Sequence, residues 1–405
     1  MIFLKIGVRN VFRNKRRSFI TASALAVSLA AMIISDGFME GMVENMIKTT
    51  TNGILGHAQI HNQKFIVNRK PEYVIQNYQR LVRILENDTS VKSWTSRVQA
   101  MGMVASPRNA KNVTIFGIDS KREKATTGLN RYLKEGKFID KDTSIVIGKG
   151  LKKKLGVQID DKIILTTTKI LTGELSQEVF RISGIISFGA RSIDSGMVFV
   201  TQTKLQKMLN VGKQVHEIVL NMGDPLKIPP ESDAIWKKLG DKGNIARNWQ
   251  TLVPSLSSTI EMSGISTLIM GSIMGILMAL IITNTLFMAI FERLFEFGVV
   301  RALGTETKHL ILTILVESMT IGILSLIGGI FLALGIGGYL SIVGIDYGGI
   351  EFNGVTFREP IYFVFRWHQW VVFPLITVVF TMIVGLYPAI FTSRLNIGNL
   401  LRKSL

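Results

Sequence analysis

The 405-residue sequence contains no cysteine, which excludes disulfide bonds and cysteine-ligated zinc. It also has no G-x-x-x-x-G-K-[ST] phosphate-binding loop, no H-E-x-x-H zinc motif and no G-x-S-x-G nucleophile motif. Histidines number five, and His57 and His61, which share one face of an expected strand, have no acidic residue beside them. We therefore predict no catalytic residue, no metal site and no cofactor within this chain.

Acidic residues are also few, 29 against 47 lysines and arginines, and the formal net charge is +18. The basic residues of the middle of the chain are scattered without arginine–aromatic clustering, so we predict no nucleic-acid partner. A basic flank before an apolar run is first a signal of membrane topology, and it also attracts anionic lipid. Such a flank, free of acids, precedes the first apolar run and contains Lys5, Arg9, Arg13, Lys15, Arg16 and Arg17.

Long runs without charge are abundant, since the chain is 47% hydrophobic although 19% of its residues are charged. Four runs are long enough to cross about 30 Å of hydrocarbon: Ser18–Ser35, Met262–Phe291, Ser318–Ile345 and Trp367–Ser393. No small-residue cleavage site follows the first run, so we expect it to remain as an anchor. Basic residues in the short loops place both chain ends and the loop 292–308 in the cytoplasm.

These signals predict an α-helical membrane protein with four transmembrane helices, arranged one plus three. A large mixed α/β extracytoplasmic domain is expected between the first and second helices. The expected segments are a cytoplasmic amphipathic basic segment at 1–17, the first transmembrane helix at 18–45, the periplasmic α/β domain at 46–250, the second helix at 251–291, a cytoplasmic coupling loop at 292–308, the third helix at 309–345, a short periplasmic loop at 346–366, the fourth helix at 367–393 and a cytoplasmic tail at 394–405.

Within the external domain, alternation predicts a strand at Ile54–His61, and helical spacing predicts a helix at Pro71–Glu86. Further predicted strands are Val113–Ile118, Ser144–Ile147, Lys162–Thr168, Val179–Ile186, Met197–Val200 and Val215–Leu220, and short helices are expected at Gly150–Leu155, Thr203–Leu209 and Pro230–Leu239.

The loop after the second run has an amphipathic pattern. Apolar residues recur at three- and four-residue spacing at Phe291, Leu294, Phe295, Gly298 and Ala302, with charges between them. Gly304 stands where a helix would be capped. Periodicity alone leaves open whether this helix lies on the lipid surface.

The stretch Asn284–Gly304 resembles the coupling segment of MacB/FtsX-type ABC transporter permeases, with the pattern N-T-L-x-M-x-x-x-E-R-x-x-E-x-G-x-x-R-A-L-G. Arg9–Arg17, Ile145–Val157, Leu386–Ala389 and Leu400–Lys403 are similar to other segments of that family. The resemblance implies that the chain is a non-catalytic subunit and that this loop docks on a dimer of separate ATPase subunits, which bind ATP and Mg. The implied coupling residues are Phe291, Glu292, Arg293, Phe295, Glu296, Gly298, Arg301, Ala302, Leu303 and Gly304.

The stretch from Ser35 to His61 is most similar to the lipoprotein-releasing (LolC/LolE-like) branch. That resemblance implies a bacterial inner (cytoplasmic) membrane protein, paired with a second permease copy or paralogue, that uses the partner's ATP hydrolysis to extract lipoproteins from the outer leaflet. A periplasmic carrier docks on an extended hook in that branch, whereas Lys169–Glu178 is short and has no evident hook. The alternative is a mechanotransmission permease for efflux of drugs, peptides or toxins, or for regulating a cell-wall hydrolase.

In the lipoprotein interpretation, acyl chains lie between the first and second spans. Methionine's flexible thioether suits variable chains, although ordinary helix packing uses the same residues. The candidates are Met32, Phe38, Met39, Met42, Met262, Ile265, Leu268 and Ile269. Gly271 and Gly275 suggest a dimer seam along the second span, and the glycines of the third span suggest packing within the chain. Asn284 and Glu317 are polar groups at membrane depth that we expect to be paired.

Overall fold

The protein is described by a computed structural model that covers residues 2–240, 243–347, 351–352, 355–356 and 359–394. The predicted tail beyond Arg394 and parts of the predicted loop 346–366 lie outside the described residues. The chain divides into two compact units. A helical unit comprises Met1–Met42, Ile260–Ile345 and Pro360–Leu405, and an α/β unit comprises Val43–Thr259 and Asp346–Glu359.

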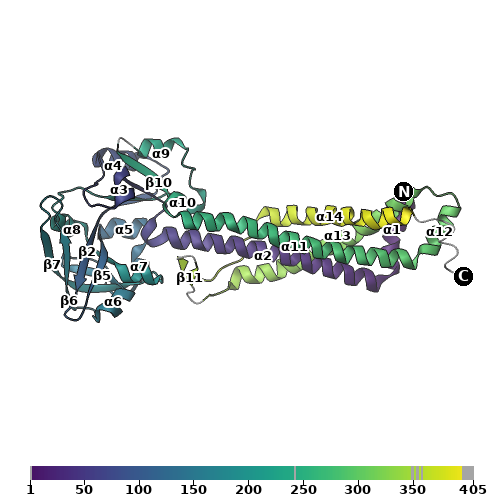
Figure 1. Cartoon of the computed structure of the whole chain (residues 1–405), viewed down its shortest axis with the longest axis horizontal. Coiled ribbons are helices and arrows are strands. Elements are labelled where there is room, and N and C mark those ends of the chain that lie inside the picture. The colour runs from purple at the N-terminus through teal and green to yellow at the C-terminus, as the bar shows by residue number, and fades with distance from the viewer. Residues whose placement is uncertain (1, 241–242, 348–350, 353–354, 357–358, 395–405) are drawn as a thin grey trace. The chain divides into compact units, whose positions relative to one another are not determined.

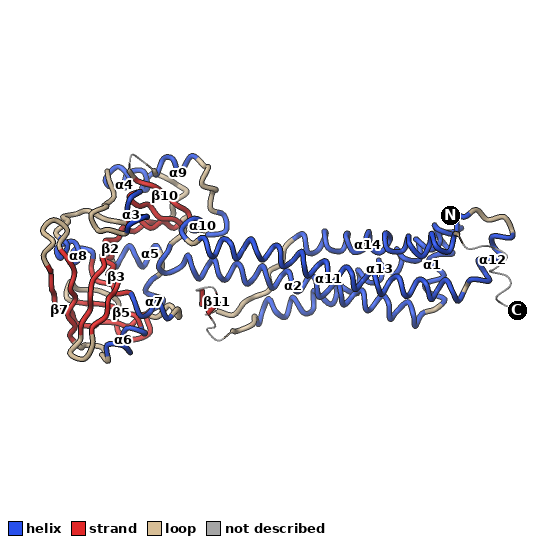
Figure 2. The backbone as a smooth tube through the Cα atoms, viewed as in Figure 1, coloured by secondary structure: helices blue, strands red, loops and turns tan. Residues whose placement is uncertain are grey.

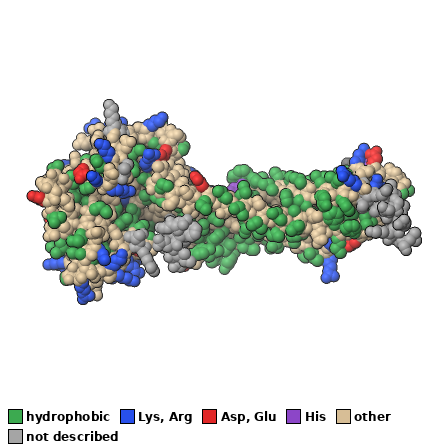
Figure 3. Space-filling view, viewed as in Figure 1, with side chains coloured by type: hydrophobic (Ala, Val, Ile, Leu, Met, Phe, Trp, Pro, Cys, Tyr) green, Lys and Arg blue, Asp and Glu red, His purple; other side chains and the backbone are tan. Residues whose placement is uncertain are grey.

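Among its described residues, the helical unit contains four helices that are long and apolar enough to cross a membrane. Figure 1 shows them running alongside one another, and Figure 3 shows hydrophobic side chains covering their visible face. At 1.5 Å per residue, the 36-residue α2 is about 54 Å long, so it extends well beyond the hydrocarbon. The helices of this unit are α1 (Ile2–Arg13), α2 (Lys15–Thr50), α11 (Pro254–Glu292), α12 (Leu294–Ala302), α13 (Thr307–Val343) and α14 (Trp367–Ser393).

Glycines let these helices pack closely within the chain. A Cβ added at Gly328 would lie 3.2 Å from the Cβ of Ala26, which brings α13 against α2. The expected intramolecular role is confirmed for Gly322, Gly328, Gly329 and Gly337, whereas Gly335 and Gly338 face open space.

The dimer seam expected at the G-x-x-x-G of the second span stays a prediction, although both glycines lie near helices of their own chain. A Cβ at Gly271 would lie 3.5 Å from the Cε of Met32 on α2, and one at Gly275 would lie 3.9 Å from the Cζ of Phe380 on α14. Both glycines therefore face helices of their own chain, because a helix places residues four apart on one face.

The α/β unit is built on a ten-stranded mixed sheet with short helices around it (Figure 2). The strand order is β10-β1-β9-β2-β3-β8-β5-β7-β4, and β6 pairs with both β2 and β7. Its strands are β1 (Ala58–Asn62), β2 (Ser93–Ala105), β3 (Ala110–Ile118), β4 (Leu133–Gly136), β5 (Ser144–Gly148), β6 (Lys162–Thr168), β7 (Leu175–Ile186), β8 (Met197–Thr201), β9 (Glu217–Asn221) and β10 (Asn244–Asn248). Its helices are α3 (Gln63–Asn68), α4 (Tyr78–Asn87), α5 (Ser120–Thr126), α6 (Lys149–Leu155), α7 (Arg191–Gly196), α8 (Gln202–Leu209), α9 (Ala234–Leu239) and α10 (Trp249–Leu252).

A buried ion network crosses this sheet. Arg97 on β2 donates to Glu123 on α5 and, over 2.9 Å, to Glu217 on β9. Burial alone would lower the pKa of Arg97, but the two carboxylates raise the pKa above its ordinary value. Arg97 also donates to the carbonyl of Ile54, in the π-helical turn Thr51–Leu55 that follows α2. The network therefore ties the end of α2 to the middle of the sheet.

Most predicted strands and helices of the external domain are present, with ends shifted by a few residues. Two expectations are wrong in part. The strand expected from Ile54 begins only at Ala58, because the preceding residues form the turn after α2. The helix expected from Pro71 begins at Tyr78, where Asn77 adopts a left-handed conformation (φ 51°) and the backbone of Gln76 is held by the side chain of Asn244.

Candidate functional site

The predicted coupling loop is a short helix that follows α11 after a single-residue break. Helix α11 ends at Glu292, Arg293 has φ −115° and ψ 15°, and α12 begins at Leu294. Phe297 and Gly298 are buried, and Phe297 packs in one cluster with Ile290 and Leu310. One face of α12 is therefore anchored on the ends of the neighbouring long helices.

Arg293 is the buried centre of this junction. Its side chain is only 2% exposed, and its Nη1 donates to the Oε2 of Glu317 on α13 over 3.2 Å. Its Nη2 donates to the carbonyl of Asn10 on α1 over 3.4 Å. One arginine thus joins α1, the α11–α12 break and α13, and the expected pairing of Glu317 is confirmed. Asn284, in contrast, is exposed, and its side chain makes no hydrogen bond among the described residues.

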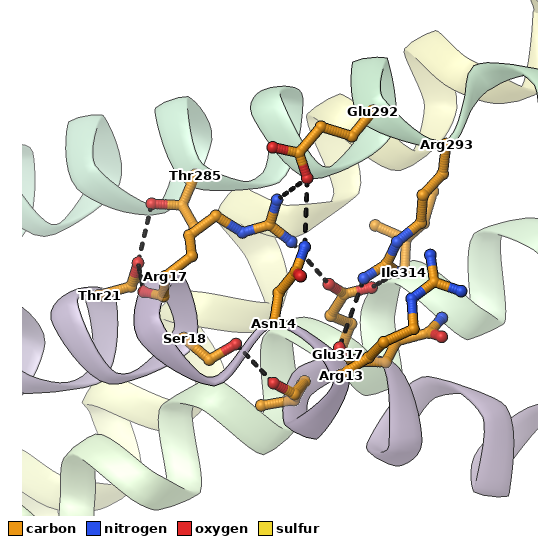
Figure 4. Close-up of polar contacts among 12 residues, drawn as sticks. Arg13, Asn14, Arg17, Ser18, Thr21, Thr285, Glu292, Arg293, Ile314 and Glu317 are labelled. Atoms are coloured by element: carbon orange, nitrogen blue, oxygen red, sulfur yellow. Dashed lines mark hydrogen bonds and ion pairs between the residues drawn. The ribbon is translucent and has the colours of Figure 1, made fainter.

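A second layer of ion pairs lies nearer the surface (Figure 4). Arg17 at the start of α2 pairs with Glu292, and the Nδ2 of Asn14 donates to the same carboxylate over 3.3 Å. Arg13 binds both carboxylate oxygens of Glu296 on α12, at 3.0 and 3.2 Å. These contacts tie the basic segment before α2 to both sides of the α11–α12 break. Since Arg13 and Glu296 are about half exposed, their pair contributes much less to stability than the buried one.

The far end of α12 closes with a glycine cap. Gly304 has φ +93°, its N–H donates to the carbonyl of Arg301, and the N–H of Thr305 donates to the carbonyl of Val300. These two bonds form a Schellman motif, which satisfies carbonyls that the helix end leaves open. The expectation that Gly304 caps this helix is confirmed.

An apolar stripe runs along the outward face of α12, from Phe291 at the end of α11 to Leu303 just after α12. Phe291, Phe295, Val299 and Leu303 follow one another at four-residue spacing, and all are exposed, Leu303 by 81%. We call these four residues the α12 stripe. Among the described residues of the helical unit, none covers the α12 stripe, and exposed apolar rows of this kind are typical of interaction sites.

The structure thus divides the predicted coupling residues between two faces. Arg293 and Gly298 are buried and hold the helix in place rather than facing outward, and Arg301 is partly buried. The exposed members are Phe291, Glu292, Phe295, Glu296, Ala302, Leu303 and Gly304. The sequence pattern had grouped Gly298 with Phe291 and Phe295 because all three are apolar or small. Phe291 and Phe295 face outward, whereas Gly298 is buried.

Arg13 and Arg17 belong to the site although the sequence analysis used them only as topology signals. Their partners lie more than 270 positions away along the chain. One sequence signal was available, since an acid-free basic segment and a loop carrying Glu292 and Glu296 have complementary charges.

The predicted substrate cavity is brought together only in part. Met32 on α2 lies against α11 at Gly271 and is half-buried, as are Phe38, Met39 and Met42. On α11 every candidate is more than half exposed, with Met262 at 65% and Leu268 at 70%. The four α11 candidates, Met262, Ile265, Leu268 and Ile269, therefore form an open apolar face rather than an enclosed pocket within one chain.

Comparison with known proteins identifies relatives for both parts of the chain. A family model described as a MacB-like periplasmic core domain matches residues 18–235, and one described as an FtsX-like permease C-terminal region matches residues 268–397. Over 349 residues the chain is 21% identical to the lipoprotein-releasing system transmembrane protein LolC of Neisseria meningitidis serogroup B, covering 80% of this chain and 79% of the relative. It is 22% identical over 438 residues to LolC of Xylella fastidiosa, covering 98% of both.

Other matches include an uncharacterized ABC transporter permease of Methanocaldococcus jannaschii, 22% identical over 348 residues and covering 82% of each chain. Among solved structures, the chain is similar to the periplasmic region of MacB from Actinobacillus actinomycetemcomitans, with 13% identity, a TM-score of 0.35 and coverage of 49% of this chain and 92% of that one.

Proposed function

Because the chain belongs to the ABC transporter permeases with a MacB-like periplasmic core domain and an FtsX-like C-terminal region, we propose that it extracts lipoproteins from the outer leaflet of the bacterial inner membrane. In this proposal two permease subunits, identical or paralogous, act with a dimer of separate ATPase subunits that bind ATP and Mg. The α/β unit lies in the periplasm, and α1, α12 and the chain ends lie in the cytoplasm. The names of the LolC relatives support this choice of substrate.

The α12 stripe is the proposed contact with the ATPase. An exposed row of large apolar side chains on a helix that is anchored from behind suits a partner that must push on it. A force applied at Phe295 or Leu303 reaches α13 through Arg293 and Glu317, and reaches α2 through Glu292 and Arg17. These ion pairs bridge the break between α11 and α12, so movement of α12 would displace α2 and α13 with it.

Helix α11 is the proposed seam with the second permease subunit. In the most apolar 18-residue stretch of α11, only 11% is buried within the chain, which is the lowest share among the four long helices. Asn284 projects a side-chain amide from this helix without a partner among the described residues. An amide at membrane depth is stabilised by a hydrogen bond across a helix interface, which a second subunit would supply.

The open face of α11 beside α2 is the observation that carries the proposed substrate. Met262, Ile265, Leu268 and Ile269 are exposed, and Met32 lies against the same helix at Gly271. Two such subunits would enclose an apolar space near the outer ends of these helices. Acyl chains need apolar contact without directional bonds, and methionine adapts to chains of different shape.

Site-specific photo-crosslinking tests this proposal in the complete complex. A photo-reactive residue in place of Met262 should capture lipoprotein before ATP is added and lose it afterwards. The matched control is Ile342, which is 80% exposed near the corresponding end of α13 and is expected to capture lipid only. Equal lipoprotein capture at both positions, or none at Met262 in a complex that hydrolyses ATP, would contradict lipoprotein extraction. The mechanotransmission alternative would then be favoured, because it needs no substrate between these helices.

The β6–β7 connection bears on the periplasmic carrier. Lys169 and Glu174 close a tight turn, with a backbone bond of 2.8 Å and an ion pair of 2.9 Å. The strands end at Thr168 and resume at Leu175, so the hairpin has no extended hook, as the sequence predicted. We propose that this subunit is the one that does not receive a carrier through a hook.

A further inference from the structure

A cavity of about 510 Å³ with both charged and apolar lining residues lies beside the ion pairs of the coupling junction, within the helical unit. Arg13, Lys15, Arg16 and Arg17 line one side of it, and Met288 and Glu292 at the end of α11 line the other. It stands where the charge-free run of α2 begins, at the boundary between apolar and basic sequence. The four cations exceed the single carboxylate among these residues, so the cavity is suited to an anion.

The cations of the cavity are not equally available. Arg17 is held by Glu292, and Arg13 is held by Glu296. Lys15 and Arg16 are exposed, and neither has a carboxylate oxygen within 4.0 Å among the described residues. The two side chains therefore present positive charge that no described carboxylate neutralises.

Apolar residues on the rim of the cavity indicate that the anion also carries an apolar part. Ile20 and Met288, exposed by 59% and 57%, stand on its membrane side as large apolar side chains. A ligand that satisfies both parts joins an anionic head to an aliphatic chain. On the other flank of α2, Lys15 also borders an apolar cavity of about 490 Å³ with Phe19, Ile327 and Gly328. A diacyl ligand with its head at Lys15 has apolar surface on both sides of the helix.

We propose that this cavity binds one anionic phospholipid of the adjoining leaflet, with its phosphate on Lys15 and Arg16 and acyl chain along Ile20 and Met288. Basic pockets between transmembrane helices at the cytoplasmic side are suited to such headgroups. The bound lipid lies beside Glu292 and Arg17 and therefore touches the junction through which α12 is joined to α2. This inference concerns a structural lipid and does not depend on the transported substrate.

Titration of the full chain in detergent with phosphatidylglycerol, followed by native mass spectrometry, tests the site. At about 1 kcal/mol per basic residue, Lys15→Gln together with Arg16→Gln should weaken binding about 30-fold. The matched control is Lys5→Gln with Arg9→Gln, which removes the same charge from α1 outside the cavity and should change affinity less than about twofold. Equal losses in the two double variants would mean general surface attraction and would overturn a specific site.

A second pair of variants tests the geometry in the opposite direction. Glu292→Gln releases the guanidinium of Arg17 towards the cavity, so phosphatidylglycerol should bind about fivefold more tightly. Glu306→Gln removes one exposed carboxylate outside the cavity and should have no such effect. Phosphatidylcholine with the same acyl chains should bind more weakly than phosphatidylglycerol. Displacement of the lipid by an equal concentration of inorganic phosphate would indicate an anion site without lipid selectivity and would refute the proposal.

Discussion

The buried pair of Arg293 and Glu317 allows the sharpest test of how the junction is held. Glu317→Gln removes the negative charge and keeps the shape of the side chain. Arg293, 2% exposed, would then retain only neutral acceptors, one of them the Asn10 carbonyl at 3.4 Å. An arginine whose Nε already lacks a partner among the described residues would become an uncompensated charge in a water-poor site. Breaking a buried pair in this way costs about 3–5 kcal/mol of unfolding free energy.

Removing Arg293 should cost less than removing the charge of Glu317. In Arg293→Met the carboxylate of Glu317 still lies 4.0 Å from the Nη2 of Arg17. A small movement of the Arg17 side chain would form a new ion pair with Glu317. The double variant Arg293→Met with Glu317→Leu removes both charges and should be within about 1 kcal/mol of the wild type, because an apolar pair has no desolvation cost. The single losses are therefore expected to be strongly non-additive.

Reversible unfolding of the full chain in mixed micelles provides the measurement. Glu296→Gln is the matched control, since it breaks the pair with Arg13 that is about half exposed on each side and should cost less than about 1 kcal/mol. The reasoning is refuted if Glu317→Gln and Glu296→Gln are equally mild. It is also refuted if the double variant loses as much stability as Arg293→Met and Glu317→Leu lose together when each is made alone, because then the pair itself contributes nothing.

Four further predictions concern topology, coupling, the helix cap and pH. Reporter fusions should place Lys5 and Lys308 in the cytoplasm and Lys121 outside, and a cytoplasmic signal at Lys121 would contradict the orientation. Leu303→Asp, and equally Arg301→Glu, should weaken attachment of the ATPase at least tenfold while the protein still inserts, whereas Leu171→Asp, an equally exposed position of the α/β unit, should leave attachment unchanged. Gly304→Val should uncouple ATP hydrolysis from transport because φ +93° strains a branched side chain by about 1–2 kcal/mol, and Gly304→Asn, which tolerates this conformation, should remain coupled. Burial lowers the pKa of His57 to about 4, below the ordinary value of 6.5, so protonation favours the unfolded state. The free energy of unfolding should therefore be highest above pH 6.5, fall by about 3 kcal/mol at most as the pH drops to 4, and stay level below that pH. His57→Asn should flatten this pH dependence in melting experiments.

The polar contact of His57 explains why the ring must stay neutral. Its Nδ1 accepts the N–H of Met222 over 3.1 Å, so a proton on that nitrogen would face another donor. His216 is arranged alike, since its Nδ1 accepts the N–H of Gln99 and its Nε2 contacts the carbonyl of Pro71, and burial lowers its pKa also. Both rings bind backbone groups, so these two histidines help to hold the domain's structure.

The sequence alone was sufficient for the membrane-spanning helices. A charge-free run such as Trp367–Ser393 has one stable form in hydrocarbon, because a helix satisfies every backbone group within itself, and α14 has the same bounds. The cap at Gly304 was also predictable, since the left-handed residue after a helix is usually glycine. These features depend on local chemistry, so they can be read without knowledge of distant contacts.

Central strand β2 was missed because its interior is polar. Arg97 and Gln99 alternate with Val98 and Ala100, a pattern that places the two polar side chains on an exposed face. Both are buried instead, because Glu123 and Glu217 pair with Arg97 and the guanidinium of Arg69 donates to the side-chain oxygen of Gln99. A lone sequence segment gives no sign that such partners exist. Only the assembled sheet makes these polar side chains compatible with a core.

The coupling junction shows the same division between local and tertiary information. The sequence predicted a short amphipathic helix after α11, but nearly every position of α12 is apolar, so periodicity could not decide which face is inward. Contacts with α1 and α13 decide it: Phe297 and Gly298 pack inward, Phe295 and Leu303 remain outside, and Arg293 is buried because Glu317 stands opposite. The sequence determined that these helices exist, because helix formation in lipid is local. The tertiary structure determined which charges meet and which apolar face stays open, because both depend on residues far apart in the chain.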